Sequence, residues 1–291
     1  MKIGQCKLCD QEAELQKSHM VCRFLVRYIT GKKAGKNTIR EHAPDGSIKT
    51  IPAGERWQHA NNIIKYAFCK ECEAKFSKLE EYVCELFYTK SSFKREKKDT
   101  YVAIVKDLPA KWGKIVDVRC VQADYKKLKL FQISLLWRWA LANYPRIDLG
   151  RHFEKLKTIL TKVKDIKDLT TDLPNEFEYP CTMINLLPSQ VEGEIREERL
   201  FTHFKYNKID GTRVYDFAAG GYAWMFSVSS HRSQDLNLIY QFTIKKDNLL
   251  FIPSIHESLY KEAQEKLQKE YLKLKELKFL KSQTKVCLLE A

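Results

Sequence analysis

The sequence predicts an α+β fold: a small cysteine-stapled ββα module, a helical middle region, an antiparallel β region and a C-terminal helix. Three observations support this prediction. Two C-x-x-C pairs stand in the first quarter of the chain, apolar segments with helical periodicity occupy its middle, and short β-branched and aromatic runs between turn residues follow. We divide the chain accordingly into residues 1–90, 91–180, 181–253 and 254–291.

The composition indicates a folded protein with an anionic partner. The chain has 291 residues, of which 44% are hydrophobic and 12% aromatic, enough to form a sizeable core. Lys and Arg number 51 against 37 Asp and Glu, a formal charge of +14. Because phosphate binding draws on many basic side chains, a nucleic acid is the expected partner.

The sequence also indicates where the protein acts. No apolar run approaches the roughly 20 residues of a membrane span. The opening segment, MKIGQCKLCDQE, lacks the apolar stretch of a secretory signal. We therefore expect a cytoplasmic protein that does not enter a membrane.

The two C-x-x-C pairs predict a zinc site. They are Cys6/Cys9 and Cys69/Cys72, and together they supply the four thiolates that a tetrahedral structural Zn²⁺ requires. Disulfides are rare in the reducing cytoplasm, so we interpret the nine cysteines as metal ligands and reduced core residues. The cysteines expected to be small buried hydrophobic residues are Cys22, Cys84, Cys120, Cys181 and Cys287.

Between and after these pairs, the module has its own predicted elements. Residues 37–54 read as a β-hairpin with its turn at Pro44-Asp45-Gly46. From Glu73 onward, apolar residues at helical spacing predict an amphipathic helix whose buried stripe is Phe76, Leu79, Val83 and Leu86.

The middle region begins with a predicted strand at 100–108 and continues into two helices. Residues 128–144 are apolar nearly all round, which is typical of a buried helix. Residues 150–165 predict an amphipathic helix with one apolar stripe: Phe153, Leu156, Ile159, Leu160 and Val163.

The segment Trp137-Arg138-Trp139 in the first of these helices has two interpretations. Its aromatic rings and cation suit stacking on bases and contact with phosphate. The surrounding leucines favour core packing instead, and Arg138 is then expected to anchor an internal carboxylate.

Residues 181–253 predict an antiparallel meander, because short apolar runs alternate with Asp-Gly, Gly-Gly and Lys-Asp-Asn turns. Residues 255–282 predict a single Lys/Glu-rich amphipathic helix. This helix either packs on the sheet or pairs with a partner protein or a second copy of the chain.

The order of the N-terminal motifs resembles the HNH (ββα-metal) endonuclease family, in its variant with four zinc cysteines. The motifs that carry the resemblance are CKLC at 6–9, Ser18-His19-Met20, and CKECE at 69–73. The chain is more closely similar to uncharacterised bacterial proteins with a Ser-His-Ile-Ile-Pro strand, which also have a helix like that at Ile133–Arg138. The resemblance implies hydrolysis of phosphodiester bonds, in DNA more than RNA, and by analogy a part in phage defence.

The resemblance also implies site residues. His19 falls on the general base, and an imidazole with a pKa of about 6.5 accepts a proton from water near neutral pH. Glu73 falls on the last ligand of the catalytic metal, and a carboxylate there suits Mg²⁺ or Mn²⁺.

The chain departs from the family pattern at other positions. Ser18 replaces the usual Asp or His ligand, and Ile64 takes the place of the customary Asn. The nearby polar residues that can take its role are His59 and Asn62, both counted here as candidate catalytic residues, and His42 of the hairpin. These departures support a second hypothesis, a non-catalytic zinc module that binds nucleic acid or a protein.

Overall fold

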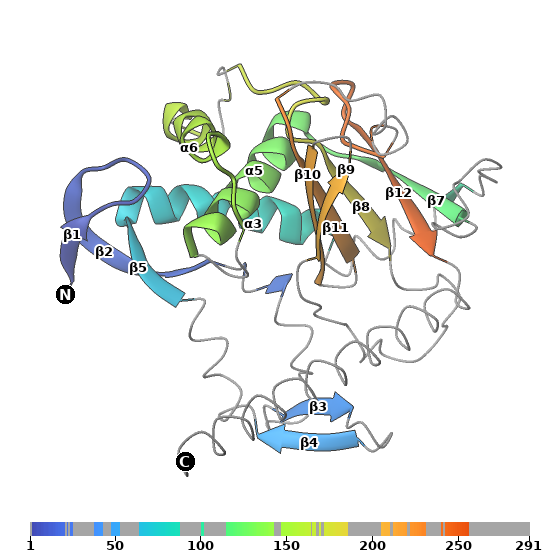
Figure 1. Ribbon diagram of the computed structural model, residues 1–291, viewed down its shortest axis with the longest axis horizontal. Coiled ribbons are helices and arrows are strands. Elements are labelled where there is room, and N and C mark those ends of the chain that lie inside the picture. The colour runs from blue at the N-terminus through green and yellow to red at the C-terminus, as the bar shows by residue number, and fades with distance from the viewer. Residues whose placement is uncertain are drawn as a thin grey trace, which may run out of the picture.

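The computed structural model describes the chain in separate ranges. They are residues 2–20, 22, 24–25, 38–42, 48–52, 64–87, 100–101, 115–142, 147–163, 165–166, 169, 172–185, 205–209, 212–219, 222–230, 240 and 242–255. Helices and strands are mixed in these ranges, with three separate sheets (Figure 1). The α+β class is therefore confirmed.

A small sheet and a long helix form the N-terminal part. The strands β1 (Ile3–Gln5), β2 (Glu12–His19) and β5 (Ile64–Cys69) pair antiparallel in the order β1-β2-β5. Helix α3 (Lys70–Phe87) follows β5 without a break, and its predicted apolar stripe is buried. The helix begins at Lys70 rather than Glu73, so Cys69 ends β5 and Cys72 lies in the first turn of the helix. Glu71 and Glu73 in that turn interact favourably with the helix dipole.

The predicted hairpin is confirmed as a pair of strands. β3 (Thr38–His42) and β4 (Ile48–Pro52) run antiparallel with Thr38 opposite Pro52. Among the strands that the structure describes, these two pair only with each other. The predicted Pro44-Asp45-Gly46 turn lies outside the described residues.

The middle helices also match their predictions. Helix α5 (Tyr125–Ala142) is buried on nearly every side, as expected from its composition, and α6 (His152–Lys162) buries Leu156 and Leu160. Phe131 of α5 lies 6.0 Å from Trp224 of the large sheet, measured between ring centroids. Helix α5 lies beside that sheet (Figure 1), and Phe131 packs against it.

A seven-stranded sheet forms the other side of the molecule, in the order β6-β7-β12-β8-β11-β10-β9. Its strands are β6 (Thr100–Tyr101), β7 (Ile115–Gln122), β8 (Cys181–Asn185), β9 (Lys205–Ile209), β10 (Thr212–Ala219), β11 (Tyr222–Val228) and β12 (Leu249–Ile255). β9, β10 and β11 form the predicted antiparallel meander, whereas β8 pairs with β11 and not with β9, the next strand along the chain.

Two further features of this sheet differ from the prediction. β12 does not extend the meander; it lies between β7 and β8, antiparallel to the first and parallel to the second. β7 is a strand that the sequence patterns do not predict. Arg119 and Val118 are neighbours in β7 and both are buried. The segment 115–122 therefore shows no clean alternation of apolar and polar residues, the pattern by which a strand is predicted.

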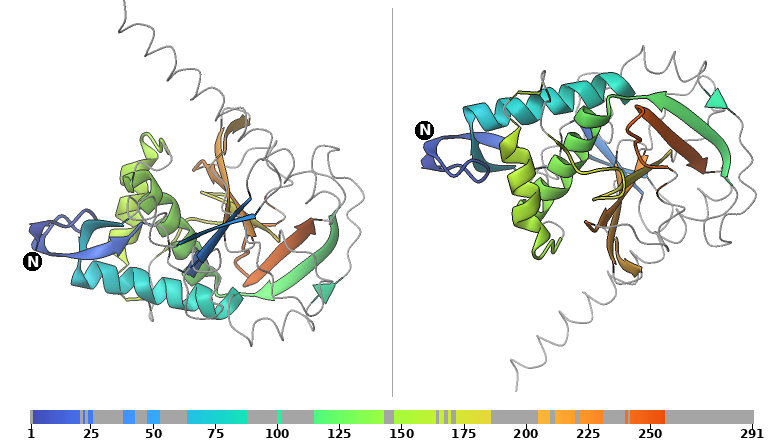
Figure 2. Two further views of the ribbon diagram at one scale, coloured as in Figure 1. Left: turned by 90° about the horizontal axis from the view of Figure 1, so that it is seen from below. Right: turned by 90° about the horizontal axis from the view of Figure 1, so that it is seen from above.

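One hydrophobic core connects these parts. It extends from Cys6 in the N-terminal module to Ile252 in β12. Helix α3 runs from the small sheet to the large one (Figure 2). There the ring centroids of Phe87, at the end of α3, and Tyr222, in β11, are 5.7 Å apart. The four-part division of the chain stays a prediction. The C-terminal helix at 255–282 falls almost wholly outside the described residues.

Among the described helices, none combines the length and apolar character needed to cross a membrane.

Candidate metal centre and the adjoining polar cluster

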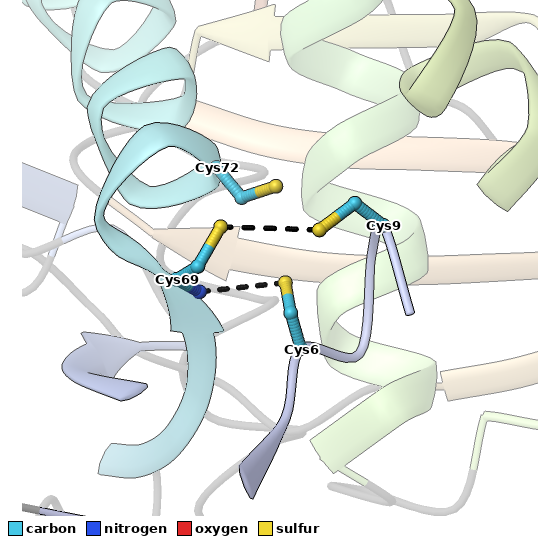
Figure 3. Close-up of side chains that lie close together, drawn as sticks. All are labelled: Cys6, Cys9, Cys69 and Cys72. Atoms are coloured by element: carbon cyan, nitrogen blue, oxygen red, sulfur yellow. Dashed lines mark hydrogen bonds between the residues drawn. The ribbon is translucent and has the colours of Figure 1, made fainter. Parts of the chain in front are cut away.

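The four cysteines of the two C-x-x-C pairs converge, although 60 residues separate Cys9 from Cys69. Their sulfur atoms all lie within 4.8 Å of one another, and those of Cys9 and Cys69 are 3.9 Å apart. Figure 3 shows the first pair on the loop after β1 and the second pair at the start of α3. We call these residues the cysteine cluster: Cys6, Cys9, Cys69 and Cys72.

The cysteine cluster fits a structural zinc ion. Zn–S bonds of about 2.3 Å in a tetrahedron place the sulfurs roughly 3.8 Å apart, close to the spacing here. All four side chains are cysteine, so no ligand position is left open for water or substrate, which is the pattern of structural and not catalytic zinc.

Backbone hydrogen bonds shape the first pair for this role. The amide of Cys6 donates to the carbonyl of Gln11, and the amide of Asp10 donates to the carbonyl of Cys6. Asp10 has a φ of 60°, a left-handed conformation that Asp tolerates better than most residues. The amide of Lys7 donates to the carbonyl of Ala67 of β5 at 2.8 Å. The loop that carries Cys6 and Cys9, here called the metal loop, is thus bonded to β5 through its backbone, independently of a metal ion.

The local environment sets one thiol apart from the others. Burial acts to raise the pKa of Cys6, but amide hydrogen bonds from Cys9, Cys69 and Leu8 outweigh it and lower the pKa to about 7. Burial raises the pKa of Cys69 to about 11 and that of Cys72 well above its ordinary value. A cation coordinated by the thiolates would lower the pKa values of Cys69 and Cys72, because its charge stabilises the deprotonated thiols.

Helix α6 supports the first pair from outside the module. Lys157 forms an ion pair with Asp10, with its Nζ 2.7 Å from Oδ1 and 2.8 Å from Oδ2. The Thr161 hydroxyl donates to the carbonyl of Leu8 at 3.2 Å. The metal loop is thus held by the small sheet on one side and by α6 on the other.

Next to the cysteine cluster, the structure brings Glu73 to the end of β2. Ser18 is fully buried, and its hydroxyl donates to the Gln16 carbonyl at 3.2 Å and also interacts with the Glu73 side chain. His19, half-buried, follows Ser18 as the last residue of β2. Glu73 therefore contacts the residue that precedes His19, while the His19 side chain leaves the strand on the opposite face, because successive side chains of a strand alternate.

The Glu73 carboxyl is in an unusual environment. Burial raises its pKa, while the Ser18 hydroxyl and the positive charge of Arg138 act in the other direction. Its Oε2 atom is buried and has no hydrogen-bond partner within the described part of the chain. A free buried carboxylate oxygen is the kind of atom that a divalent cation or a polar ligand satisfies.

A buried ion pair lies beside Glu73. Arg138, on α5, is 1% exposed, and its Nη1 donates to Glu80 Oε1 of α3 at 2.6 Å. This confirms core packing of the segment around Arg138 and its pairing with a carboxylate. We call the group the polar cluster: Ser18, Cys22, Glu73, Glu80 and Arg138.

Glu80 is a residue that the sequence reasoning missed. It stands two helical turns after Glu73, so both carboxylates share one face of α3. The seven-residue spacing in the sequence could have indicated that Glu80 lies near Glu73. It does not indicate that α5 packs over this face of α3 and brings Arg138 to Glu80. Of the remaining sequence candidates, His42 ends β3, while His59 and Asn62 lie outside the described residues.

Comparison of the chain with known protein families, with curated proteins and with solved structures finds no match. Its function therefore has to be inferred from the residues of the site.

Proposed function

We propose that this chain is a metal-dependent endonuclease of the HNH type that hydrolyses phosphodiester bonds of DNA. The observation that supports this most is the contact between the end of β2 and the first turn of α3, beside the cysteine cluster. There the Ser18 side chain contacts Glu73, and His19 is the next residue.

Each residue of this junction has a role in the proposal. His19 is the general base that accepts a proton from the attacking water, a contribution typically worth about 10²–10⁴ in rate. Glu73 holds a divalent cation through its free Oε2, and Ser18 orients the carboxylate. A bound Mg²⁺ or Mn²⁺ supplies positive charge against the charge that develops on the scissile phosphate.

The cysteine cluster has a structural part in this proposal. With zinc bound, Cys69 and Cys72 fix the first turn of α3, which carries Glu73. Cys6 and Cys9 fix the loop between β1 and β2. Zinc would thereby hold β2, which ends at His19, against the first turn of α3, which carries Glu73. The formal charge of +14 is consistent with a DNA substrate, since phosphate contacts need Lys and Arg. A role in antiviral defence would be one setting for such an enzyme.

A second candidate is a zinc module that binds nucleic acid or a protein without cleaving it. The specific observation in its favour is the positive charge of Arg138, which acts on Glu73 and opposes a divalent cation there. Ser18, an uncharged residue, offers only a weak ligand beside it.

Cleavage of supercoiled plasmid tests the proposal. The purified chain is incubated with Mg²⁺ or Mn²⁺, beside His19→Ala, Glu73→Gln and, as a matched control, His152→Gln on α6. We expect nicking by the wild type and the control, and a loss of at least about 100-fold in both site variants. Zinc content of one ion per chain and an unchanged circular dichroism spectrum verify that the variants fold.

The alternative outcome is equally informative. If the wild type carries zinc, binds a labelled duplex and does not nick it with either metal, the endonuclease proposal is wrong and the binding module is favoured. Equal cleavage by the wild type and His19→Ala would remove His19 from the base role.

A further inference from the structure

We propose that Arg138 is a positioning residue for the candidate site: from α5 it fixes the end of β2, and with it His19, against α3. The catalytic consequence rests on the proposed function, while the structural consequence can be measured without it.

Contacts of the guanidinium with three different elements support the inference. Nη1 donates to the backbone carbonyl of His19 at 3.3 Å and to Glu80 Oε1 at 2.6 Å. Nε donates to the carbonyl of Ser134 within α5 at 3.4 Å. One side chain therefore connects the last residue of β2, the middle of α3 and its own helix.

Two further contacts fix the plane of the guanidinium. Nη2 donates to the sulfur of Cys22, just beyond the end of β2, at 3.3 Å. The Phe76 ring of α3 lies 4.9 Å from the guanidinium carbon, in cation–π geometry. The planar fork is thus held by hydrogen bonds at its edge and by a ring on its face.

Burial assigns this residue a positioning role and not contact with substrate. Arg138 is 1% exposed, and its Nη1 is engaged by Glu80 and His19, so a phosphate in solvent does not reach it. Its place matters because β2 has a register irregularity between Gln16 and Lys17 and ends at His19. Pairing with β5 alone gives this end weaker support than a regular ladder.

Arginine is required for this geometry. Its fork presents five N–H donors in fixed directions, whereas a lysine ammonium is a point charge on a flexible stem. A lysine here can keep the Glu80 ion pair, but it cannot hold His19, Cys22 and Glu80 together.

The test compares Arg138→Lys and Arg138→Met with Lys129→Met. Lys129 is a matched control, because it is a second buried cation on α5 whose ammonium binds the carbonyls of Glu178 and Tyr179, away from β2. Plasmid cleavage gives kcat and KM, and hydrogen–deuterium exchange with mass spectrometry follows a peptide covering residues 12–22.

We expect Arg138→Lys to lower kcat at least about tenfold, with KM within about twofold of wild type. Arg138→Met should lower kcat further. Both should speed amide exchange at the end of β2, while Lys129→Met leaves the exchange of this peptide and the kcat of the folded protein unchanged.

Two results would overturn the inference. One is wild-type exchange at the end of β2 in Arg138→Lys and Arg138→Met; the other is the same acceleration in Lys129→Met, which would indicate general loosening of the core. If the wild type does not cleave DNA, the proposed function fails, and exchange alone still decides whether Arg138 holds β2.

Discussion

Arg138 and Glu80 show how this protein accommodates charge in its interior. Removing two ions from water costs several kcal/mol each, and the attraction between them offsets this only with good geometry and further hydrogen bonds. Arg138 has those partners, and the Glu80 side chain keeps 21% of its surface exposed. Such a pair contributes little net stability, but losing one member leaves the other charge without compensation.

Glu80→Gln should therefore destabilise the fold by about 3 kcal/mol, since it leaves Arg138 charged and buried. Urea denaturation measures this loss. Glu81→Gln is the control, because Glu81 is the exposed neighbour on α3 and its change should stay within about 0.5 kcal/mol. Equal values for the two variants would show that the buried pair is not coupled to stability.

Lys129 should make stability depend on pH. Burial lowers the pKa of Lys129 to about 8, below the value of about 10.4 in an unfolded chain. Between these values the unfolded state binds more protons, so the free energy of unfolding rises with pH, by up to roughly 3 kcal/mol, and is constant below pH 8.

The measurement is the difference in unfolding free energy between the wild type and Lys129→Met at pH 7 and pH 10. Taking the difference removes the titration of cysteines common to both proteins. The wild type should gain on the variant as the pH increases; a difference that is independent of pH would contradict the assignment.

At the scale of elements, the cysteine cluster joins pieces that are weak alone. β1 has only three residues, so the β1-β2 hairpin depends on its contacts with β5, α3 and α6 for support. Metal binding to such a site contributes directly to folding, because the unfolded chain has no preformed site.

Cys69→Ser should remove zinc from the protein, because three thiolates do not complete the tetrahedron. Cys84→Ser, on the same helix and outside the cysteine cluster, should retain one zinc ion per chain. Elemental analysis by mass spectrometry gives the zinc content. Zinc retained in Cys69→Ser, or lost in both variants, would show that these four sulfurs are not the ligands.

The sequence is informative about elements whose periodicity reflects their burial. The stripe from Phe76 to Leu86 and the apolar length of α5 predict two helices, because each helix buries the residues that define its pattern. β7 is not predicted, because its inward positions include Arg119. The place of β12 is also not predicted, since strand order depends on tertiary packing that no local pattern encodes.

The same distinction applies to the site. The spacing within each C-x-x-C pair is a local property that the sequence shows, and the convergence of the two pairs follows from the four thiolates that a tetrahedral zinc ion requires. That Arg138 anchors a carboxylate follows from its apolar surroundings, but the identity of Glu80 depends on how α5 crosses α3. Contacts between helices far apart in the chain are therefore the part that sequence reasoning does not supply.

At the scale of the whole molecule, the N-terminal module and the large sheet share side chains of one core. Trp137 of α5 is fully buried and lies 6.0 Å from Phe68 of β5 and 5.5 Å from Phe153 of α6, between ring centroids. A core of this kind predicts that these parts unfold together.

Zinc-loaded protein should therefore unfold in one transition, with tryptophan fluorescence and far-ultraviolet circular dichroism giving the same midpoint. Trp137→Ala should lower the unfolding free energy by about 3–5 kcal/mol through the cavity it leaves and keep the transitions coincident. Separate transitions for the two probes would support independent folding of residues 1–90.

The position of β12 has a consequence for synthesis on the ribosome. This strand is the last that the structure describes, yet it stands between β7 and β8 in the sheet. Until Leu249–Ile255 has left the exit tunnel, β7 and β8 each expose an unpaired edge, and a sheet that waits for a distant strand forms slowly. The cysteine cluster is complete much earlier, once Cys72 has emerged, so a nascent chain can acquire zinc while its large sheet is still open to chaperones or to aggregation.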